Sequence, residues 1–290
     1  MGKSIRFLKR IYLGLFSPLR KKVSANIVTL APNELLSGKT AVITGCTSGI
    51  GLAIARAFLN AGANIVAIGR NKGKLDKAVA DLSLLAKGDS KVYSYILDML
   101  ESDKLEGAVK DIIRLIPNHK IDILVNNAGL GGVASATEME EYDIVMNTNL
   151  KAVYFFTRYV ARHMIAEKTE GNILNVASSS SLRPAGNVYG LSKWGVRGLT
   201  AGFAKMLIKH NIVVNAVGPC GTATPFMRMN DNDELFSRTI PAGRFATPEE
   251  VANIAVVLTS NLGRMIVGDV VYLSGGAGVV TCDDVDYDFN

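Results

Sequence analysis

Cysteine is scarce in this chain of 290 residues, and so are the patterns that would give it a structural role. Cys46, Cys220 and Cys282 are odd in number, lie far apart and form no C-x-x-C pair. This spacing indicates neither a disulfide framework nor a zinc site, and the sequence predicts no other metal site. Such cysteine usage is typical of a reducing compartment, so we expect a cytoplasmic protein.

Acidic residues are absent from the first 22 positions, although the chain as a whole carries a formal net charge of +6. Without the seven basic residues of this segment, 25 basic residues stand against 26 acidic ones, so the body of the protein is nearly neutral. The charge therefore does not indicate nucleic-acid binding by the whole protein. The seven residues are Lys3, Arg6, Lys9, Arg10, Arg20, Lys21 and Lys22.

Long hydrophobic runs are also missing from residues 1–37. The longest apolar run there covers residues 11–16, which is far too short to span a bilayer. Apolar and basic side chains fall on opposite sides of a helical wheel, so residues 1–37 are predicted to be a basic amphipathic arm. Such a helix either packs on its own domain or a neighbouring subunit, or makes peripheral contact with a membrane, and the sequence leaves both open. At the other end, residues 279–290 form an acidic tail to which we assign no function.

Between these extensions, residues 38–278 alternate short β-branched runs with segments of helical periodicity. This alternation predicts an α/β, doubly wound Rossmann fold, in which a seven-stranded parallel sheet carries helices on both faces. In such a sheet ligands bind beyond the carboxyl ends of the strands. The predicted strands lie within residues 39–45, 63–69, 91–97, 121–127, 171–178, 211–218 and 269–275.

A glycine-rich turn, TGCTSGIG, follows the first predicted strand. Gly45, Gly49 and Gly51 allow the backbone to turn sharply and approach a pyrophosphate, and the following helix offers its positive end to the anion. The second strand ends in Arg70, with no acid between residues 67 and 75. An NAD site would need an acid there for the ribose hydroxyls, whereas Arg accommodates a 2′-phosphate, so the sequence favours NADP(H). The alternative is that Arg70, Lys72 and Lys74 are only the solvated start of a helix.

Six motifs, taken in order and at their mutual spacing, resemble the short-chain dehydrogenase/reductase family over residues 38–278. They are TGCTSGIG (44–51), NNAG (126–129), Asn149 in NTNL, Ser178, YGLSK (189–193) and the P-x-x-x-x-T of PCGTAT (219–224). The segment PAGRFATPEEVAN (241–253) is similar to the 3-oxoacyl-carrier-protein reductases of that family. One departure is Cys220, because relatives usually carry Gly after the Pro, and a side chain there affects the nicotinamide pocket or its loop.

The resemblance implies a cofactor site and four catalytic residues. Asp98 would bind the adenine, the NNAG segment would support the central strand and line the cofactor, and Thr224 would meet the nicotinamide carboxamide. The implied cofactor-binding residues are Gly45, Thr47, Ser48, Gly49, Ile50, Gly51, Arg70, Asp98, Met99, Asn127, Ala128, Gly129, Tyr189, Lys193, Pro219, Thr222 and Thr224. The implied catalytic residues are Ser178, Tyr189, Lys193 and Asn149.

Tyr189 and Lys193 lie four positions apart, which places both on one face of a helix. A phenol has a pKa of about 10, and a neighbouring cation favours the phenolate, so Lys193 is expected to lower the pKa of Tyr189. Tyr189 would then exchange a proton with the substrate oxygen while a serine hydroxyl stabilises the developing charge. By the resemblance, Asn149 would hold a water that relays protons to Lys193.

Four serines follow one another at residues 178–181, so the catalytic hydroxyl can be chosen only by its spacing from neighbouring motifs. The N-x-x-S pattern from Asn175 selects Ser178, and counting back from Tyr189 also favours it, although the gap of eleven is shorter than usual. Ser179 is the competitor if the shortened loop shifts the end of the strand.

The sequence therefore predicts an NADP(H)-dependent oxidoreductase acting on a carbonyl or secondary alcohol, with a 3-oxoacyl group or another apolar ketone as substrate. Phe226, Met227, Met229 and Phe236 in the segment after Thr224 favour an apolar substrate, unless they are core residues of a flap. The enzymatic alternative is a polyol, sugar or steroid dehydrogenase, and the alternative from another class is a catalytically idle NADP-binding regulatory protein. Expected partners are a small or carrier-bound carbonyl substrate and further copies of the chain, since the resemblance implies a homodimer or homotetramer through helices at about 149–168 and 188–209.

Overall fold

The computed structural model describes residues 31–132, 136–229 and 233–280. The amphipathic helix expected before residue 31 and the acidic tail after residue 280 lie outside these ranges, as does Cys282. In the ranges described, no helix has both the length and the hydropathy needed to cross a membrane.

Seven parallel strands form one sheet in the order β3-β2-β1-β4-β5-β6-β7, which confirms the predicted fold. Each strand lies inside its predicted run or within one residue of it. The strands are β1 Thr40–Thr44, β2 Asn64–Gly69, β3 Val92–Ile96, β4 Ile123–Asn126, β5 Asn172–Val176, β6 Val213–Pro219 and β7 Val270–Leu273. The order reverses between β1 and β4, where Val42 pairs with Leu124, and this is the place where doubly wound sheets open a crevice for ligands.

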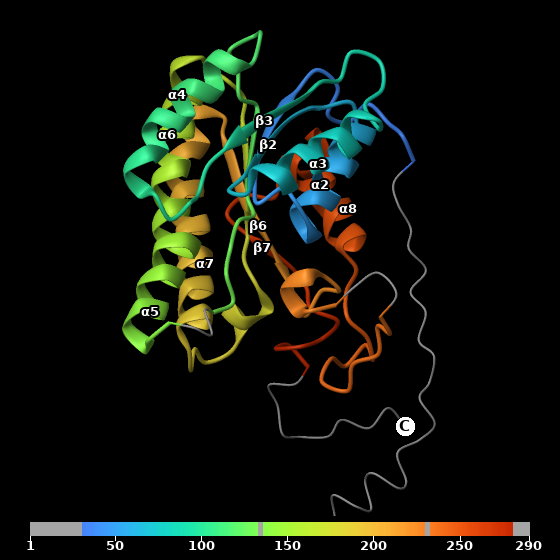
Figure 1. Cartoon of the computed structure of the whole chain (residues 1–290), viewed down its shortest axis with the longest axis vertical. Coiled ribbons are helices and arrows are strands. Elements are labelled where there is room, and N and C mark those ends of the chain that lie inside the picture. Colours follow the sequence, from blue (N-terminus) through green and yellow to red (C-terminus); the bar gives the residue numbers. More distant parts are fainter. Residues whose placement is uncertain (1–30, 133–135, 230–232, 281–290) are drawn as a thin grey trace, which may run out of the picture.

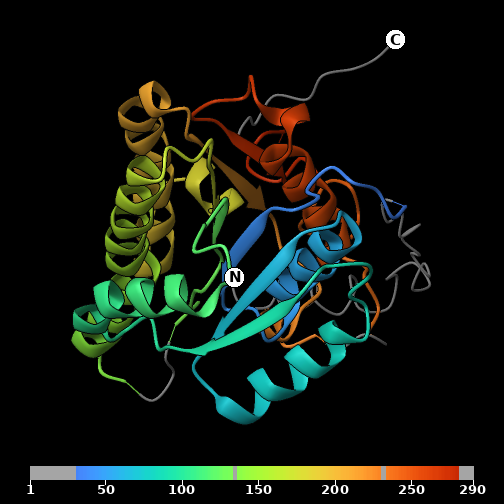
Figure 2. The same cartoon turned by 90° about the horizontal axis from the view of Figure 1, so that it is seen from above.

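Helices cover both faces of the sheet (Figures 1 and 2). Helices α2, α3 and α8 pack on one face, and α4, α6 and α7 pack on the other, with α5 next to α7. Neighbouring residues of β1 show the alternation, because Ile43 belongs to the core under α2 and α8 while Val42 belongs to the core under α4 and α6. The helices are α2 Gly49–Asn60, α3 Lys72–Ser83, α4 Leu105–Leu115, α5 Glu138–Met146, α6 Ala152–Ala166, α7 Val188–Leu207 and α8 Pro248–Thr259.

Short helical turns connect these elements, and several of them lie at the carboxyl edge of the sheet. The turn η2, Asn147–Lys151, is π-helical and joins α5 directly to α6. Turns of this kind often mark functional sites. The 3-10 turns are η1 Ser102–Lys104, η3 Ser179–Leu182, η4 Ile208–His210, η5 Pro225–Met227 and η6 Asn261–Gly263.

The two long helices that the resemblance implied as subunit contacts correspond to α6 and α7. Leu191 and Met206 of α7 expose nearly half of their surface in the single chain. Association through these helices stays a prediction.

Candidate active site

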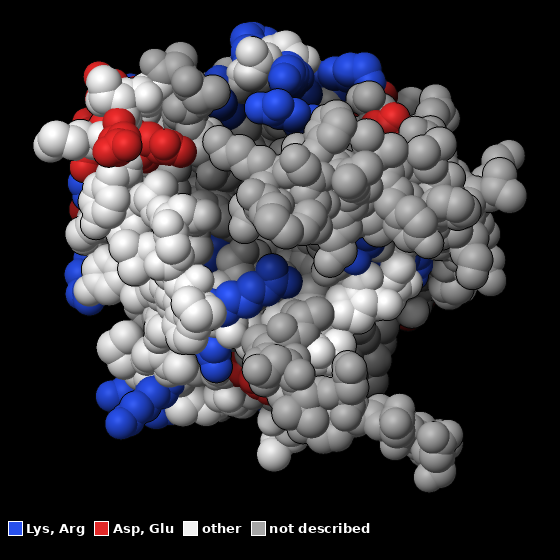
Figure 3. All heavy atoms as spheres, turned by 90° about the horizontal axis from the view of Figure 1, so that it is seen from below, with Lys and Arg blue, Asp and Glu red and all other residues white. Residues whose placement is uncertain are grey.

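One cavity of about 690 Å³ lies at the carboxyl edge of the sheet. Its walls come from the segments that follow β1, β2, β3, β4, β5 and β6, so the two sides of the strand-order reversal both contribute. Figure 3 views the molecule from this edge, and basic side chains lie among uncharged ones near the middle of the face. The position agrees with the general rule for ligand sites in open α/β sheets.

The glycine turn after β1 forms one wall. Gly45 has a φ of +66° and Gly49 a φ of +55°, conformations that L side chains rarely adopt. A Cβ at Gly45 would lie 2.9 Å from Ala128 Cα, so this turn can pass the next strand only without a side chain. Thr47, Ser48 and Ile50 also line the cavity, and Ser48 precedes α2 without capping it through its side chain. The first turn of α2 therefore presents uncapped backbone N–H groups, as an anion site requires.

Gly51 has a different place from the one predicted. It does not line the cavity but lies inside α2, where a Cβ would collide with Asn127 Nδ2 and the Gly45 carbonyl oxygen. Its contribution to a cofactor site is therefore indirect, through the shape of the turn.

The NNAG segment ties the ends of β1 and β4 together. Asn127 Nδ2 donates to the carbonyl oxygens of Thr44 at 2.9 Å and Gly45 at 3.0 Å. In return, Thr44 Oγ1 accepts the backbone N–H groups of Asn127 and Ala128, both at 3.0 Å. Asn127, Ala128 and Gly129 line the cavity, and their contact with a cofactor stays a prediction. Thr44 was missed by the sequence reasoning, although its place as the last residue of the strand before the glycine turn is a usable signal.

Arg70 and Asp98 lie together at one end of the cavity. Arg70 Nη1 is 3.7 Å from Asp98 Oδ2, and the Arg70 side chain is 63% exposed. Such an exposed pair contributes little to stability and leaves the guanidinium free to meet a ligand. Lys74 lines the same end, at the first turn of α3, whose N-cap is Asn71. Met99 completes the predicted residues here.

Tyr189 and Ser178 meet in the cavity. Tyr189 stands in the first turn of α7, which Asn187 caps by accepting the Gly190 N–H at 2.8 Å. Ser178 follows β5 and hydrogen-bonds to the Tyr189 phenol. Its Oγ accepts the Ser180 N–H at 3.1 Å and donates to Ser180 Oγ at 3.2 Å, and both bonds fix the side chain.

Lys193 lies one helical turn after Tyr189, and its Nζ is 5.8 Å from the centre of the phenol ring. The lysine is buried and donates to the Val176 carbonyl oxygen at 2.7 Å. Burial lowers the pKa of Lys193 to about 8. Burial also raises the pKa of Tyr189, and the Ser178 hydrogen bond lowers it only in part. The structure thus differs from the expectation that Lys193 lowers the pKa of Tyr189, because the cost of desolvating the phenolate dominates.

Asn149 lies in the π-helical turn and does not line the cavity. Its Oδ1 accepts the Leu130 N–H at 2.8 Å, and its Nδ2 donates to the Leu130 carbonyl at 2.8 Å and to Ser192 Oγ at 3.1 Å. A Cβ at Gly129 would lie 3.3 Å from Asn149 Oδ1 and 3.7 Å from Lys193 Nζ, so the two polar groups face the same glycine. Asn149 supports the wall next to Lys193, and the water relay stays a prediction.

The other serines divide into two groups. Ser179 and Ser180 line the cavity beside Ser178, whereas Ser181 is buried and bonds to the Ser178 carbonyl at 2.7 Å and to Tyr272 Oη at 3.0 Å. Ser178 is the serine whose hydrogen bond lowers the pKa of Tyr189, and the bonds of Ser181 give it a structural role.

The segment after β6 forms the wall next to the glycine turn. Pro219, Cys220, Thr222 and Thr224 line the cavity, and a Cβ at Gly49 would lie 3.1 Å from Thr224 Cγ2. The pKa of the Cys220 thiol is raised, chiefly by burial. Cys220 thus adds a neutral thiol to the wall.

Two of the four apolar flap residues line the cavity. These are Phe226 and Met227 of η5, and the Phe226 ring lies 6.0 Å from the Tyr189 ring, centre to centre. Met229 and Phe236 are half-buried, do not line the cavity and belong to none of the core clusters of the described residues. Phe245 also lines the cavity and was missed, because no local pattern connects it to a site more than twenty residues earlier.

Comparison with known proteins gives consistent matches. Residues 39–235 match the sequence profile of the family described as short chain dehydrogenase. The 3-oxoacyl-(acyl-carrier-protein) reductase FabG of Thermotoga maritima is 37% identical over 248 residues, covering 83% of this chain and 98% of that protein. A 3-ketoacyl-(acyl-carrier-protein) reductase structure from Brucella melitensis, in complex with NADH, has a TM-score of 0.73 and 32% identity, with 84% of this chain and 99% of that one covered. A structure from Beutenbergia cavernae, described as an NAD(P)-dependent gluconate 5-dehydrogenase with NADP at low occupancy, has a TM-score of 0.73 and 30% identity, covering 84% and 98%.

Proposed function

The chain belongs to the short-chain dehydrogenase/reductase family, and we propose that residues 38–278 form an NADP(H)-dependent reductase of 3-oxoacyl groups or other apolar ketones. Membership of the family makes the protein an oxidoreductase that interconverts CH–OH and C=O groups. The observation that carries the proposal is the meeting of Ser178, Tyr189 and Lys193 in one cavity that continues to the glycine turn.

The residues around the cavity fit a nicotinamide dinucleotide. The glycine turn lines the cavity with little side-chain bulk, and the uncapped start of α2 suits a pyrophosphate. At the far end, Arg70 and Lys74 supply two positive charges for a 2′-phosphate, which favours NADP(H) over NAD(H). The solved relatives do not decide between the two cofactors, because one structure contains NADH and another contains NADP.

A bound nicotinamide would supply the hydride, and the chain's own residues would handle the proton and the charge. Tyr189 would donate its proton to the substrate oxygen during reduction and take it back during oxidation. Its raised pKa keeps the phenol protonated at neutral pH, which suits a proton donor. Ser178 would donate a hydrogen bond to the same oxygen. Lys193, with a pKa of about 8, is mostly protonated at pH 7 and would stabilise the phenolate left by proton transfer.

The substrate end of the cavity favours an apolar ketone. Phe226, Met227, Ile240 and Phe245 contribute apolar side chains there, and the ring of Phe226 lies next to that of Tyr189. The similarity to 3-oxoacyl-carrier-protein reductases supports an acyl thioester, presented free or on a carrier. The similarity to a gluconate 5-dehydrogenase supports a second candidate, the dehydrogenation of a sugar acid.

A direct kinetic comparison separates these candidates. Purified protein is assayed for NADPH oxidation with acetoacetyl-N-acetylcysteamine and with 5-ketogluconate, each repeated with NADH. We expect a higher kcat/KM for the thioester and for NADPH. A higher kcat/KM for the keto acid would replace the acyl substrate by the sugar acid. Tight NADPH binding without turnover of any ketone would indicate an idle binding protein instead.

A further inference from the structure

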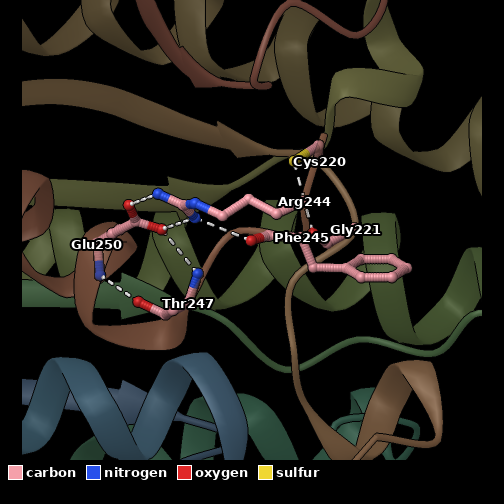
Figure 4. Close-up of polar contacts among 6 residues, drawn as sticks. All are labelled: Cys220, Gly221, Arg244, Phe245, Thr247 and Glu250. Carbon is pink, nitrogen blue, oxygen red and sulfur yellow. Dashed lines mark hydrogen bonds and ion pairs between the residues drawn. The ribbon is translucent and has the colours of Figure 1, made fainter. Parts of the chain in front are cut away.

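Residues 244–247 connect the segment after β6 to the start of α8, and Arg244 is the centre of this connection (Figure 4). Its Nη1 donates to the Phe245 carbonyl oxygen at 2.9 Å and to Glu250 Oε2 at 3.0 Å. Its Nη2 donates to Glu250 Oε1 at 2.6 Å. The guanidinium therefore hydrogen-bonds to both carboxylate oxygens and to one backbone carbonyl at the same time, a geometry that lysine cannot reproduce.

Glu250 is also part of the cap of α8. Its Oε2 accepts the Thr247 N–H at 2.9 Å, and Thr247 Oγ1 accepts the Glu250 N–H at 3.3 Å, which completes a capping box. Both side chains of the ion pair are about three-quarters buried. The pair is thus anchored to a regular helix on one side and to the chain at Phe245 on the other.

Phe245 and Ala246 in turn support the wall after β6. A Cβ at Gly221 would lie 2.7 Å from Phe245 Cδ1, so the ring packs directly on Gly221. The Ala246 N–H donates to the Gly221 carbonyl at 3.0 Å, and the Ala246 carbonyl accepts the Ala223 N–H at 2.9 Å. Figure 4 shows the Phe245 side chain beside Gly221, with Cys220 on the side of Arg244. The backbone of residues 220–224 therefore rests on residues 245 and 246.

We propose that Arg244 and Glu250 are positioning residues for the nicotinamide half of the cofactor site. They hold Phe245 and Ala246 in place, and these hold the Cys220–Thr224 wall against the glycine turn, where Thr224 faces Gly49. The pair acts through that wall and contacts no reacting group. This inference rests on the proposed function, because it takes the wall after β6 as the nicotinamide end and the Arg70 end as the adenosine end.

The test compares two ligands that share the adenosine half. NADPH and 2′-phospho-ADP-ribose, which lacks the nicotinamide, are titrated by calorimetry into wild type and Arg244→Lys. Lysine keeps the charge but loses at least one of the charge-assisted bonds, so we expect the Kd of NADPH to rise about tenfold. The Kd of 2′-phospho-ADP-ribose should stay within about twofold. Glu250→Gln, which retains an acceptor for the Thr247 N–H, is a milder second variant and should give the same pattern.

Arg264→Lys is the matched control, since Arg264 is similarly buried, pairs with Glu170 and donates to the Asn211 carbonyl, away from the cavity. It should change neither Kd. An equal rise in the Kd of both ligands in Arg244→Lys would mean that the ion pair only stabilises the fold, and it would overturn the inference. Unchanged binding of both ligands would overturn it as well. Wild type that binds 2′-phospho-ADP-ribose as tightly as NADPH, or binds neither, would count against the proposed function itself.

Discussion

The Lys193 ammonium group lies 2.7 Å from the carbonyl oxygen of Val176, the last residue of β5. This bond holds a buried cation at the carboxyl edge of the sheet, one helical turn from Tyr189. A single backbone carbonyl replaces only part of the water that surrounds an exposed ammonium group, and burial lowers the pKa of Lys193 to about 8.

The buried lysine predicts a stability that rises with pH in the alkaline range. The pKa of Lys193 is about 8 in the folded protein, against 10.5 for an exposed lysine, so the folded state releases its proton first. The energetic cost of the buried charge is fully present below pH 8 and is relieved as pH rises toward 10.5. Relative to Lys193→Met, the free energy of unfolding of wild type should rise by on the order of 2 kcal/mol between pH 7.5 and 9.5.

Urea unfolding of both proteins across this range measures the difference. The comparison with Lys193→Met removes the contributions of other titrating groups, including Lys39, whose pKa burial also lowers. Parallel pH profiles for the two proteins would show that the Lys193 charge is not destabilised by burial.

Tyr189 is expected to be the proton donor, so its hydroxyl should matter for turnover and little for cofactor binding. Tyr189→Phe should lower kcat by about 10²- to 10⁴-fold, the range of a lost general acid. The Kd of NADPH should stay close to that of wild type. Tyr142→Phe makes the same change at an exposed position of α5 and should leave both constants unaltered. Near-normal turnover by Tyr189→Phe would contradict the assignment.

The serine that contacts the phenol should be the one that stabilises the substrate oxygen. Ser178→Ala should lower kcat by about 10²- to 10³-fold, as for the loss of one donor to a developing oxyanion. Ser179→Ala is expected to lower it by less than about tenfold, because its neighbour already contacts Tyr189. Steady-state kinetics of the two variants gives the comparison, and a larger loss in Ser179→Ala would move the role to that residue.

Gly51 should tolerate no side chain even though it does not line the cavity. Gly51→Ala would place a methyl group against Asn127 Nδ2 and the Gly45 carbonyl, so it should destabilise the fold by about 1–3 kcal/mol and weaken NADPH binding. Gly107→Ala in α4, where nothing lies within 4 Å of the added Cβ, should instead stabilise the protein by about 0.5–1 kcal/mol. Thermal unfolding and NADPH titration of both variants distinguish a steric effect at Gly51 from a general effect of removing glycine.

The strands and the residues at their ends could be predicted because they depend on local pattern. Buried parallel strands need continuous β-branched runs, and a glycine-rich turn directly after the first strand is typical of a dinucleotide site. Thr47 and Arg70 follow their strands in the sequence, so the strand pattern alone predicts that they lie at the carboxyl edge, where both line the cavity.

The remaining parts of the site depend on contacts between distant segments. Gly221 packs against the Phe245 ring, and Asn149 hydrogen-bonds to the backbone of Leu130. No local sequence pattern predicts either contact. The pKa of Tyr189 could not be predicted either, because it depends on the extent of burial in addition to the identity of the neighbour four positions away. Gly51 was assigned to the cofactor from its motif, whereas its position inside α2 follows from how the turn packs on Asn127.

Arg70 should decide between the two nicotinamide dinucleotides. Its guanidinium is exposed at the end of the cavity, and its 3.7 Å contact with Asp98 is a weak pair that a 2′-phosphate can replace. Arg70→Ala should therefore raise the KM for NADPH by about 10- to 100-fold, the cost of losing charge-assisted hydrogen bonds, and should change the KM for NADH by less than about threefold. Lys72→Ala removes a neighbouring charge that pairs with Asp76 and does not line the cavity, so it should leave the NADPH preference intact. An equal loss with both cofactors in Arg70→Ala would mean that Arg70 supports the ribose or the fold, and the 2′-phosphate would then have to be bound through Lys74.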